Sequence, residues 1–187
     1  MNVLLHICCA NCAVYPLDVF NKRGIDIAGF WYNPNIHPLT EYALRLEAVK
    51  LLAASNHVEI LYDNYYGLAE FIEIAGKKGT DRCAACYGMR LTQTAKKAKE
   101  LGYSAFSTTL LYSIYQKHEV IVETAAEIAE QYSIEFYEED FRKGWHEGME
   151  MSKKLSLYRQ KYCGCIYSEM ERYAGKMQRS TEGFRIS

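Results

Sequence analysis

Cysteines are the residues of this sequence most able to do chemistry. Six of the seven fall into pairs that lie far apart in the sequence, so only folding can bring them together. Thiolates are soft ligands, and four of them from short spacings are the usual cradle for an iron–sulfur cluster or a structural zinc ion. Two cysteines remain when four are used, which indicates redox chemistry more than structure. The pairs are Cys8-Cys9, Cys83-x-x-Cys86 and Cys163-Gly-Cys165.

The first two pairs have the sequence context of metal ligands. Cys8 and Cys9 follow a predicted strand directly, and Cys83 and Cys86 open a predicted helix. A thiolate at a helix N-terminus is stabilised by the helix dipole, which favours metal ligation. The run Cys-Cys-Ala-Asn-Cys contains no glycine, so it does not predict the phosphate-binding loop that nucleotide-binding proteins carry at this point. Cys12 remains open, either as an extra ligand or as a thiol near the metal.

The third pair differs in kind, because a single glycine separates its two cysteines. A disulfide between Cys163 and Cys165 would close a small, strained ring, and strained disulfides tend to be the redox-active ones. We expect this pair to cycle between dithiol and disulfide. Metal ligation by the same two residues stays open as an alternative.

Several polar residues are candidates to line the same site, because they follow predicted strands or lie near the third cysteine pair. Hydroxyl, amide and charged groups there could hydrogen bond to a substrate, and an imidazole or a carboxylic acid could donate a proton. Sixteen tyrosines could also provide stacking for unpaired bases. The catalytic candidates are His37 and Asp140, and the substrate-binding candidates are Asn33, Asn35, Thr108, Arg142 and Arg159.

Composition places the chain among ordinary globular proteins. Hydrophobic residues make up 49% and charged residues 24% of the 187 residues, enough for one domain with its own core. No apolar run approaches the roughly 20 residues of a membrane span, and the N-terminus lacks the basic region of a signal peptide. We therefore expect a cytoplasmic protein without a membrane partner, where clustered cysteines bind metal or react.

Charge is distributed unevenly along the chain. From Arg142 to Ser187 there are ten Lys/Arg and five Asp/Glu, a local net charge of +5 that leaves −6 for the remainder. A basic C-terminal quarter could bind a polyanion such as RNA. The alternative is a solvated helical face that happens to be basic.

The order of short β-rich runs and helical patterns predicts an α/β fold. Strands separated by helices favour a parallel sheet covered on both faces, followed by a helical C-terminal segment. We expect one domain over residues 1–178 and a flexible tail over 179–187. Thr40 is the expected N-cap of the second helix, and Gly24 and Gly102 should follow helix ends. The predicted strands are 3–7, 25–31, 58–62, 105–109 and 134–137; the predicted helices are 14–22, 40–54, 65–75, 87–101, 118–131, 144–158 and 168–176.

Taken together, these motifs resemble the QueH type of epoxyqueuosine reductase. The resemblance runs in the same order from about residue 3 to residue 173. One departure is Asn11, where many relatives have proline. The motifs are residues 4–12 (LLHICCANC), 33–38 (NPNIHP), 82–87 (RCAACY), 106–110 (FSTTL), 140–143 (DFRK) and 158–168 (YRQKYCGCIYS).

The resemblance implies the last step of queuosine biosynthesis, which is the reduction of epoxyqueuosine to queuosine at the wobble position of a tRNA with a GUN anticodon. It implies an oxidoreductase with a Rossmann-like fold of the HUP type, and an external electron donor. It also implies a 4Fe–4S cluster on Cys8, Cys9, Cys83 and Cys86, with Cys163 and Cys165 as the redox-active pair.

The reduction needs two electrons, whereas a 4Fe–4S cluster usually cycles by one. The dithiol could supply both, and a second, mononuclear iron beside the cluster, on spare thiolates or Asp81, is the competing source. Two other functions stay open: a cluster-dependent tRNA thiolase, against which the missing phosphate loop argues, and a non-catalytic zinc-bound RNA-binding module.

Overall fold

A parallel sheet forms the centre of the molecule, and the computed structural model describes residues 1–77 and 81–186. Its strands in this described part are β1 (Asn2–His6), β2 (Asp26–Trp31), β3 (Ile60–Tyr62), β4 (Ala105–Thr108) and β5 (Glu135–Phe136). Their order is β3-β2-β1-β4-β5, so β1 lies in the middle. Leu4 of β1 pairs with Ala28 on one side and with Phe106 on the other. Four of the five residues of β1 are buried, as expected for a strand covered on both faces.

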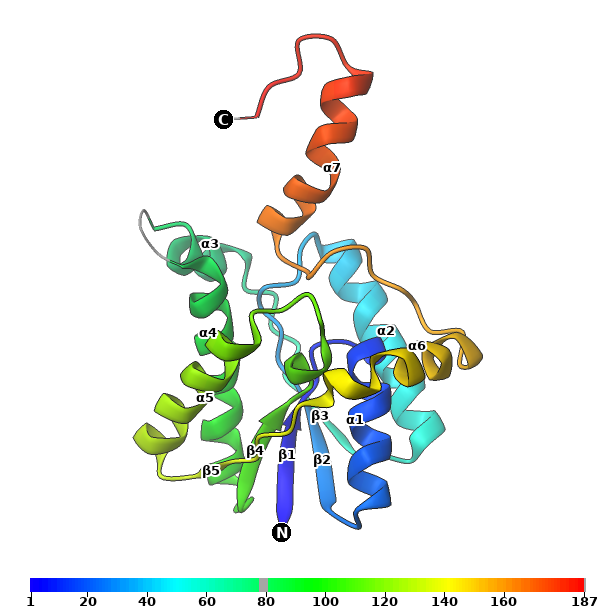
Figure 1. The fold of residues 1–187 in the computed structure, drawn as a ribbon. Coiled ribbons are helices and arrows are strands. Elements are labelled where there is room, and N and C mark those ends of the chain that lie inside the picture. The colour runs from blue at the N-terminus through cyan, green and yellow to red at the C-terminus, as the bar shows by residue number, and fades with distance from the viewer. Residues whose placement is uncertain (78–80, 187) are drawn as a thin grey trace.

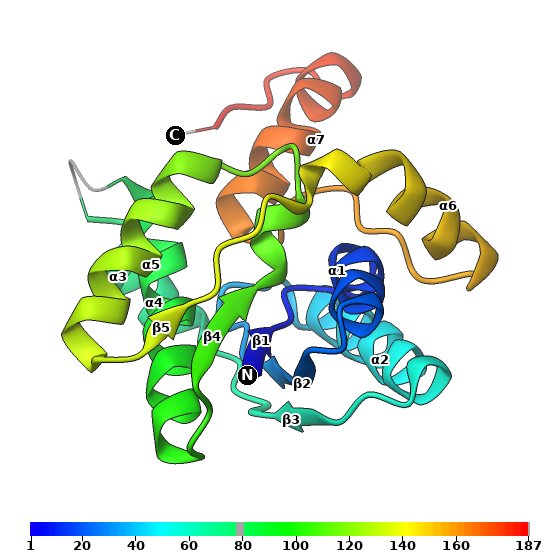
Figure 2. The ribbon, with the colours of Figure 1, turned by 60° about the horizontal axis from the view of Figure 1, so that its bottom comes forward.

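Helices cover both faces of this sheet. The helices of the described residues are α1 (Ala10–Lys22), α2 (Leu39–Asn56), α3 (Leu68–Ala75), α4 (Arg82–Glu100), α5 (His118–Tyr132), α6 (Trp145–Lys154) and α7 (Ile166–Ser180), with short 3-10 helices η1 (Thr109–Tyr112) and η2 (Phe141–Gly144). Figure 2 shows α1 and α2 on one side of the strands and α4 and α5 on the other. The predicted class, a Rossmann-like α/β fold with a helical C-terminal segment, is confirmed.

Element boundaries follow the predictions in part. All five strands form, and Gly24 and Gly102 follow α1 and α4 with φ of 65° and 75°, which glycine adopts without strain. The expected N-cap at Thr40 is wrong, because α2 already begins at Leu39 after Pro38 and no side chain caps it. α1 begins at Ala10, before the predicted start at residue 14, because Cys9 caps it.

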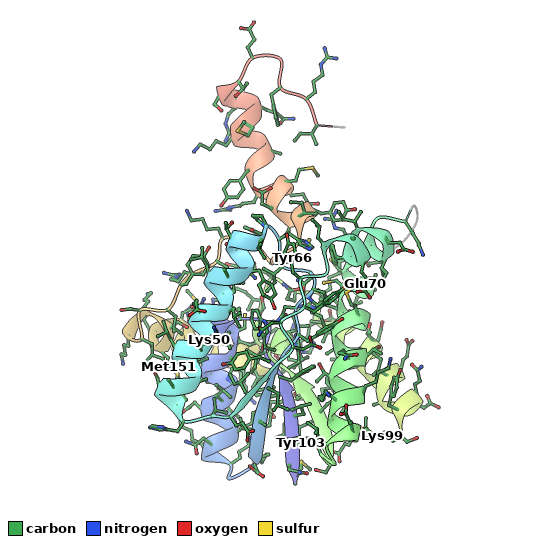
Figure 3. The ribbon with its side chains drawn as sticks, turned by 180° about the vertical axis from the view of Figure 1, so that it is seen from behind. Lys50, Tyr66, Glu70, Lys99, Tyr103 and Met151 are labelled. Atoms are coloured by element: carbon green, nitrogen blue, oxygen red, sulfur yellow. The ribbon has the colours of Figure 1, made fainter. Side chains whose placement is uncertain are left out.

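The carboxyl ends of the strands meet at one edge of the sheet, the upper edge in Figure 1. α1 and α4 begin at this edge, and the start of α7 lies above it. Figure 3 labels Tyr66 near the same edge and Tyr103 at the opposite one. In parallel α/β sheets, ligands bind beyond the carboxyl ends of the strands. The functional site is therefore sought at this carboxyl edge.

α7 projects away from the sheet and its covering helices (Figure 1), and none of its residues is buried. It ends at Ser180 and so overlaps the start of the predicted tail. A single domain over residues 1–178 with a flexible tail after it stays a prediction. In the described part of the chain, no helix is long and apolar enough to cross a membrane.

Candidate metal and active site at the carboxyl edge of the sheet

Three thiols meet where β1 ends and α1 begins. The sulfur atoms of Cys8, Cys9 and Cys12 all lie within 4.8 Å of one another, and all three residues are buried. Cys9 is the N-cap of α1, and its sulfur accepts a hydrogen bond from the backbone N–H of Cys12 at 3.4 Å. Hydrogen bonding with Cys12 and Cys8 lowers the pKa of the Cys9 thiol. This group can bind a metal ion, and it includes Cys12, whose role the sequence leaves open.

Neighbouring side chains hold the sulfur atoms of this group in place. The hydroxyl of Thr109 donates to the sulfur of Cys8 at 3.2 Å and accepts from the backbone N–H of Cys8 at 2.9 Å. The amide of Gln160 donates to the sulfur of Cys9 at 2.9 Å. Asn11 donates to the side-chain oxygen of Gln160 at 2.7 Å, which sets the orientation of that amide. The residue that departs from the family pattern therefore supports a hydrogen bond to sulfur.

Cys83 and Cys86 lie in the first two turns of α4, after the N-cap Asp81. Asp81 accepts hydrogen bonds from the backbone N–H groups of Cys83 and Ala84 and pairs with Lys117. Cys86 is buried and Cys83 is half-buried. The pair therefore lies at a helix N-terminus, as predicted, and its thiols face the positive end of the helix dipole.

Arg90 connects the cysteine groups electrostatically. It is 4% exposed, and its Nη2 donates to the sulfur of Cys86 at 3.2 Å. Burial alone would lower the pKa of the Arg90 guanidinium. The nearby thiols of Cys86, Cys8 and Cys163 outweigh this effect, so the net shift of that pKa is upward. One cysteine from each of the three sequence groups thus lies near the same cation.

The Cys163-Gly-Cys165 turn lies beside these groups. The two sulfur atoms are 3.9 Å apart, and Cys165 packs in one apolar cluster with Cys86 and Phe71. Cys165 is the N-cap of α7, and its sulfur accepts a hydrogen bond from the backbone N–H of Ser168. Hydrogen bonding with Cys165 and Ser168 lowers the pKa of the exposed Cys163 thiol to about 5. The two thiols are close enough for a small rotation to bring them into bonding distance.

A buried ion pair anchors this turn to α2. Arg45 and Glu41 form a salt bridge of 2.7 Å, with side chains that are 2% and 8% exposed. The guanidinium of Arg45 also donates to the backbone oxygens of Cys163 and Tyr162, each at 2.9 Å. The Tyr158 hydroxyl donates to the second oxygen of Glu41 at 2.6 Å. The backbone on both sides of the turn is thereby fixed to α2.

Buried polar atoms without partners lie next to the turn. Asn33, Asn35 and His37 are at most 2% exposed, yet the side-chain oxygens of both asparagines and both ring nitrogens of His37 lack hydrogen-bond partners within the described residues. The backbone N–H of His37 donates to the oxygen of Gly164 at 2.8 Å. Burial lowers the pKa of His37 to about 4, so its ring is neutral near pH 7. Unsatisfied buried polar groups need an explanation, and a bound ligand is one.

The other predicted site residues lie in different surroundings. Thr108 is buried, but its hydroxyl is already engaged by His6 at 2.9 Å. Asp140 and Arg142 are bound to each other by two hydrogen bonds of 2.8 Å, on the exposed side of η2. Arg159 is exposed and lies three residues before Tyr162, whose backbone oxygen binds Arg45. Contact of these residues with a substrate stays a prediction.

An open groove of about 250 Å³ lies between α3 and α4, lined by residues that include Glu70, labelled in Figure 3. Ala85 and Met89, on either side of Cys86 in sequence, also line it. Tyr32 in its wall stacks on Tyr65 with rings 8° from parallel. The groove therefore carries an aromatic ring in its wall, and no cysteine of the described residues lines it.

Comparison with known proteins agrees with this geometry. A family model described as epoxyqueuosine reductase QueH matches residues 3–171. The chain belongs to the QueH family. It is 40% identical to epoxyqueuosine reductase QueH of Dehalococcoides mccartyi, over 91% of this chain and 94% of that protein. Identity to the QueH of Thermotoga maritima is 38%, over 91% of each chain. As a QueH family member, the chain is an enzyme and an oxidoreductase.

Among solved structures, the zinc-inhibited form of teicoplanin deacetylase Orf2 aligns with a TM-score of 0.48 and 8% sequence identity. That alignment covers 73% of this chain and 66% of the deacetylase. No function is inferred from a similarity of this size.

The residues around the cysteines of this QueH family member fit a metal centre bound by thiolates. Three helices place their N-terminal ends at cysteines, because Cys9 and Cys165 cap α1 and α7 and Cys83 lies in the first turn of α4. Helix N-termini and the buried Arg90 favour negative charge. Thiolates with a bound metal supply that negative charge.

Sequence analysis missed several residues that contact the cysteines. Arg90 follows Cys86 by one helical turn, a spacing that could have indicated the contact. Gln160 and Thr109 lie inside motifs that were recognised. Glu41 and Arg45 stand at i and i+4 in a helix, a pattern that usually marks a solvated ion pair and gives no hint of burial.

Proposed function

We propose that this chain reduces epoxyqueuosine to queuosine at the wobble position of a tRNA with a GUN anticodon. The proposal rests on QueH family membership over most of the chain. The structural observation that supports it best is the meeting of three helix N-termini and a buried arginine at the cysteines. Such surroundings suit thiolates that hold a redox centre, and a reductase needs one.

The proposed centre is a 4Fe–4S cluster. When bound, it would supply one-electron transfer or Lewis acidity toward the epoxide oxygen. Cys12 is the competing ligand, since its sulfur lies with those of Cys8 and Cys9. The same spare thiolate could hold a second, mononuclear iron. The proposed ligands are Cys8, Cys9, Cys83 and Cys86.

The two electrons are proposed to come from the Cys163 and Cys165 dithiol. Removing the epoxide oxygen as water leaves an alkene and requires two electrons and two protons. Oxidation of two thiols to one disulfide releases that number of each, so the reaction balances. A low pKa on Cys163 and a raised pKa on Cys165 give one thiolate nucleophile and one proton donor, and the proton that Cys163 has already released is supplied by the solvent. An external dithiol reductant must then reduce the disulfide before the next turnover.

The buried polar residues beside the turn are proposed to hold the modified base. Asn33 and Asn35 offer side-chain oxygens without partners to the hydroxyl groups of the substrate ring. His37 is neutral and would donate one N–H to the epoxide oxygen, which orients that oxygen for protonation. An anticodon loop lets a base leave its stack at lower cost than a duplex does.

The test is an anaerobic assay of the reconstituted chain on tRNA that carries epoxyqueuosine, followed by mass spectrometry of the nucleosides. We expect queuosine to replace epoxyqueuosine in the presence of a dithiol, and the purified protein to be brown. Unmodified tRNA with the same anticodon is the control for nonspecific products. A brown protein that inserts sulfur into tRNA would indicate a thiolase, and a colourless zinc protein that only binds tRNA would indicate a binding module.

A further inference from the structure

Arg90 is a buried cation whose partner is sulfur. Its Nε donates to the backbone oxygen of Cys86 at 3.1 Å and its Nη2 to the sulfur of Cys86 at 3.2 Å. No carboxylate lies within 4.0 Å of its guanidinium in residues 1–77 and 81–186. Burying a charge is costly unless an opposite charge accompanies it. The fold must therefore supply negative charge to Arg90 from another source.

The second buried arginine shows the usual solution. Arg45 is as deeply buried as Arg90, and it forms a salt bridge of 2.7 Å with the carboxylate of Glu41. Arg90 has thiols in the equivalent role, those of Cys86, Cys8 and Cys163. Two of these belong to the proposed ligand set of the metal centre. If Cys8 and Cys86 bind the centre as thiolates, the negative charge of that centre is the counter-charge of Arg90.

We propose that Arg90 is a positioning residue that sets the redox potential of the cysteine-bound centre. This inference rests on the proposed function, since it requires a redox centre on the cysteines. Reduction adds one negative charge to the centre, and a nearby cation in a medium of low dielectric stabilises that added charge. Hydrogen bonds to the sulfur ligands act in the same direction.

The charge of Arg90 should matter more than its hydrogen bond. Thr109 and Gln160 also donate to cysteine sulfur atoms, at 3.2 and 2.9 Å, and both are neutral. A hydrogen bond from a charged donor is roughly twice as strong as one between neutral groups. Arg90 therefore combines the donor role of those two residues with a full positive charge.

The experiment is a redox titration of the anaerobically reconstituted full chain, followed by visible absorbance and electron paramagnetic resonance. Arg90→Gln removes the charge but keeps a donor, and Arg90→Lys keeps the charge. Arg23→Gln is the matched control, because it removes one positive charge from a partly exposed arginine after the far end of α1. Iron content and melting temperature are measured for each variant alongside the midpoint potential.

We expect Arg90→Gln to lower the reduced-to-oxidised ratio at fixed potential at least tenfold, a midpoint shift of about 59 mV to more negative values for one electron. In Arg90→Lys and Arg23→Gln, the reduced-to-oxidised ratio at the same potential should stay within about threefold of the wild-type ratio. An unchanged midpoint in Arg90→Gln with full iron content would overturn the role of Arg90 and leave the proposed function standing.

If Arg90→Gln does not fold or loses its iron, Arg90→Lys carries the test. A midpoint potential in Arg90→Lys displaced by more than about 59 mV would show that a positive charge at this position does not by itself set the potential, and would overturn the proposed role. A wild-type chain that holds no redox-active centre at all would overturn the proposed function, and the role of Arg90 with it.

Discussion

At the scale of single residues, exposure sets Cys163 apart from the other six cysteines. Cys8, Cys9, Cys12 and Cys86 are buried, whereas Cys163 is exposed and has a pKa lowered to about 5 by hydrogen bonding with Cys165 and Ser168. Buried thiols are protected from solution oxidants. An exposed thiolate reacts readily with a disulfide or a reductant. Cys163 is therefore the thiol best placed to react with a soluble partner, whereas Cys165 is buried and Cys83 is half-buried.

The first prediction concerns the four proposed cluster ligands. Serine at Cys8, Cys9, Cys83 or Cys86 should each reduce the iron and sulfide bound after reconstitution to less than about a third, because an alcohol oxygen is a poor ligand for this soft site. Cys12→Ser, a change inside the same buried group, is the matched control and should keep most of the iron. Full cluster content in any of the four variants would remove that residue from the set, and loss in Cys12→Ser would add Cys12.

The second prediction concerns the proposed redox-active pair, Cys163 and Cys165. Cys163→Ser or Cys165→Ser should leave iron content and tRNA affinity close to wild type but abolish multiple turnovers, because one thiol cannot form the internal disulfide. Product per enzyme is counted under single- and multiple-turnover conditions. Iron loss in Cys165→Ser would show that the pair binds the metal centre. The second electron would then have to come from another metal ion.

At the scale of elements, the contact between α2 and the Cys163 turn connects stability with function. Removing one partner of a buried ion pair leaves a charge without compensation. The third prediction is that Arg45→Met, which leaves the buried carboxylate of Glu41 without its partner, lowers the free energy of unfolding by about 3 kcal/mol. Urea denaturation followed by circular dichroism measures the loss.

A matched control for this prediction lies on the same helix. Lys50, labelled in Figure 3, pairs with Glu47 on the exposed face of α2. Lys50→Met should cost no more than about 0.5 kcal/mol, since exposed pairs contribute little. Equal effects of the two substitutions would show that the buried pair does not anchor the turn.

The elements themselves were largely predictable from sequence, and the site only in part. Alternation of short apolar runs with helical patterns predicted all five strands, because β1 and its neighbours are buried on both faces and are rich in apolar residues. The start of α1 was not predicted, since cysteine and asparagine have low helix propensity and the capping role of Cys9 appears only in three dimensions.

The side chains around the cysteines could not be inferred in the same way. Arg90 and Arg45 look like surface cations in sequence, and only the fold shows that each is buried with a different partner. Gln160 reaches Cys9 from 151 residues away. Contacts of this length have no local periodicity, so pattern reasoning cannot find them.

At the scale of the whole molecule, charge asymmetry leads to the fourth prediction. Lys153 and Lys154 at the end of α6 belong to the basic C-terminal quarter and are exposed. Replacing both with Glu should weaken tRNA binding about tenfold or more and reduce the slope of log affinity against log salt by about 1–2, because fewer counterions are released. Filter binding across a salt series measures both quantities.

Lys97 and Lys99 near the end of α4 give the matched control for that prediction. Lys97 pairs with Glu100 as Lys153 pairs with Glu150, and Figure 3 shows Lys99 at the far end of the molecule from α7. Glutamate at both control positions makes the same change in net charge and should leave the slope unaltered. Equal losses from the two double variants would mean that total charge, and no particular face, governs binding.

The central position of β1 has a consequence for how the protein is made. β1 pairs with β4, and His6 and Thr108, hydrogen bonded across that pair, are 102 residues apart. Pairing over such a distance is slow, because the chain loses loop entropy before the contacts form. Until β4 has been synthesised and has docked, Cys8 and Cys9 have no cover and can react with any oxidant. The thiols of Cys8 and Cys9 are therefore most at risk of oxidation in the nascent or refolding chain.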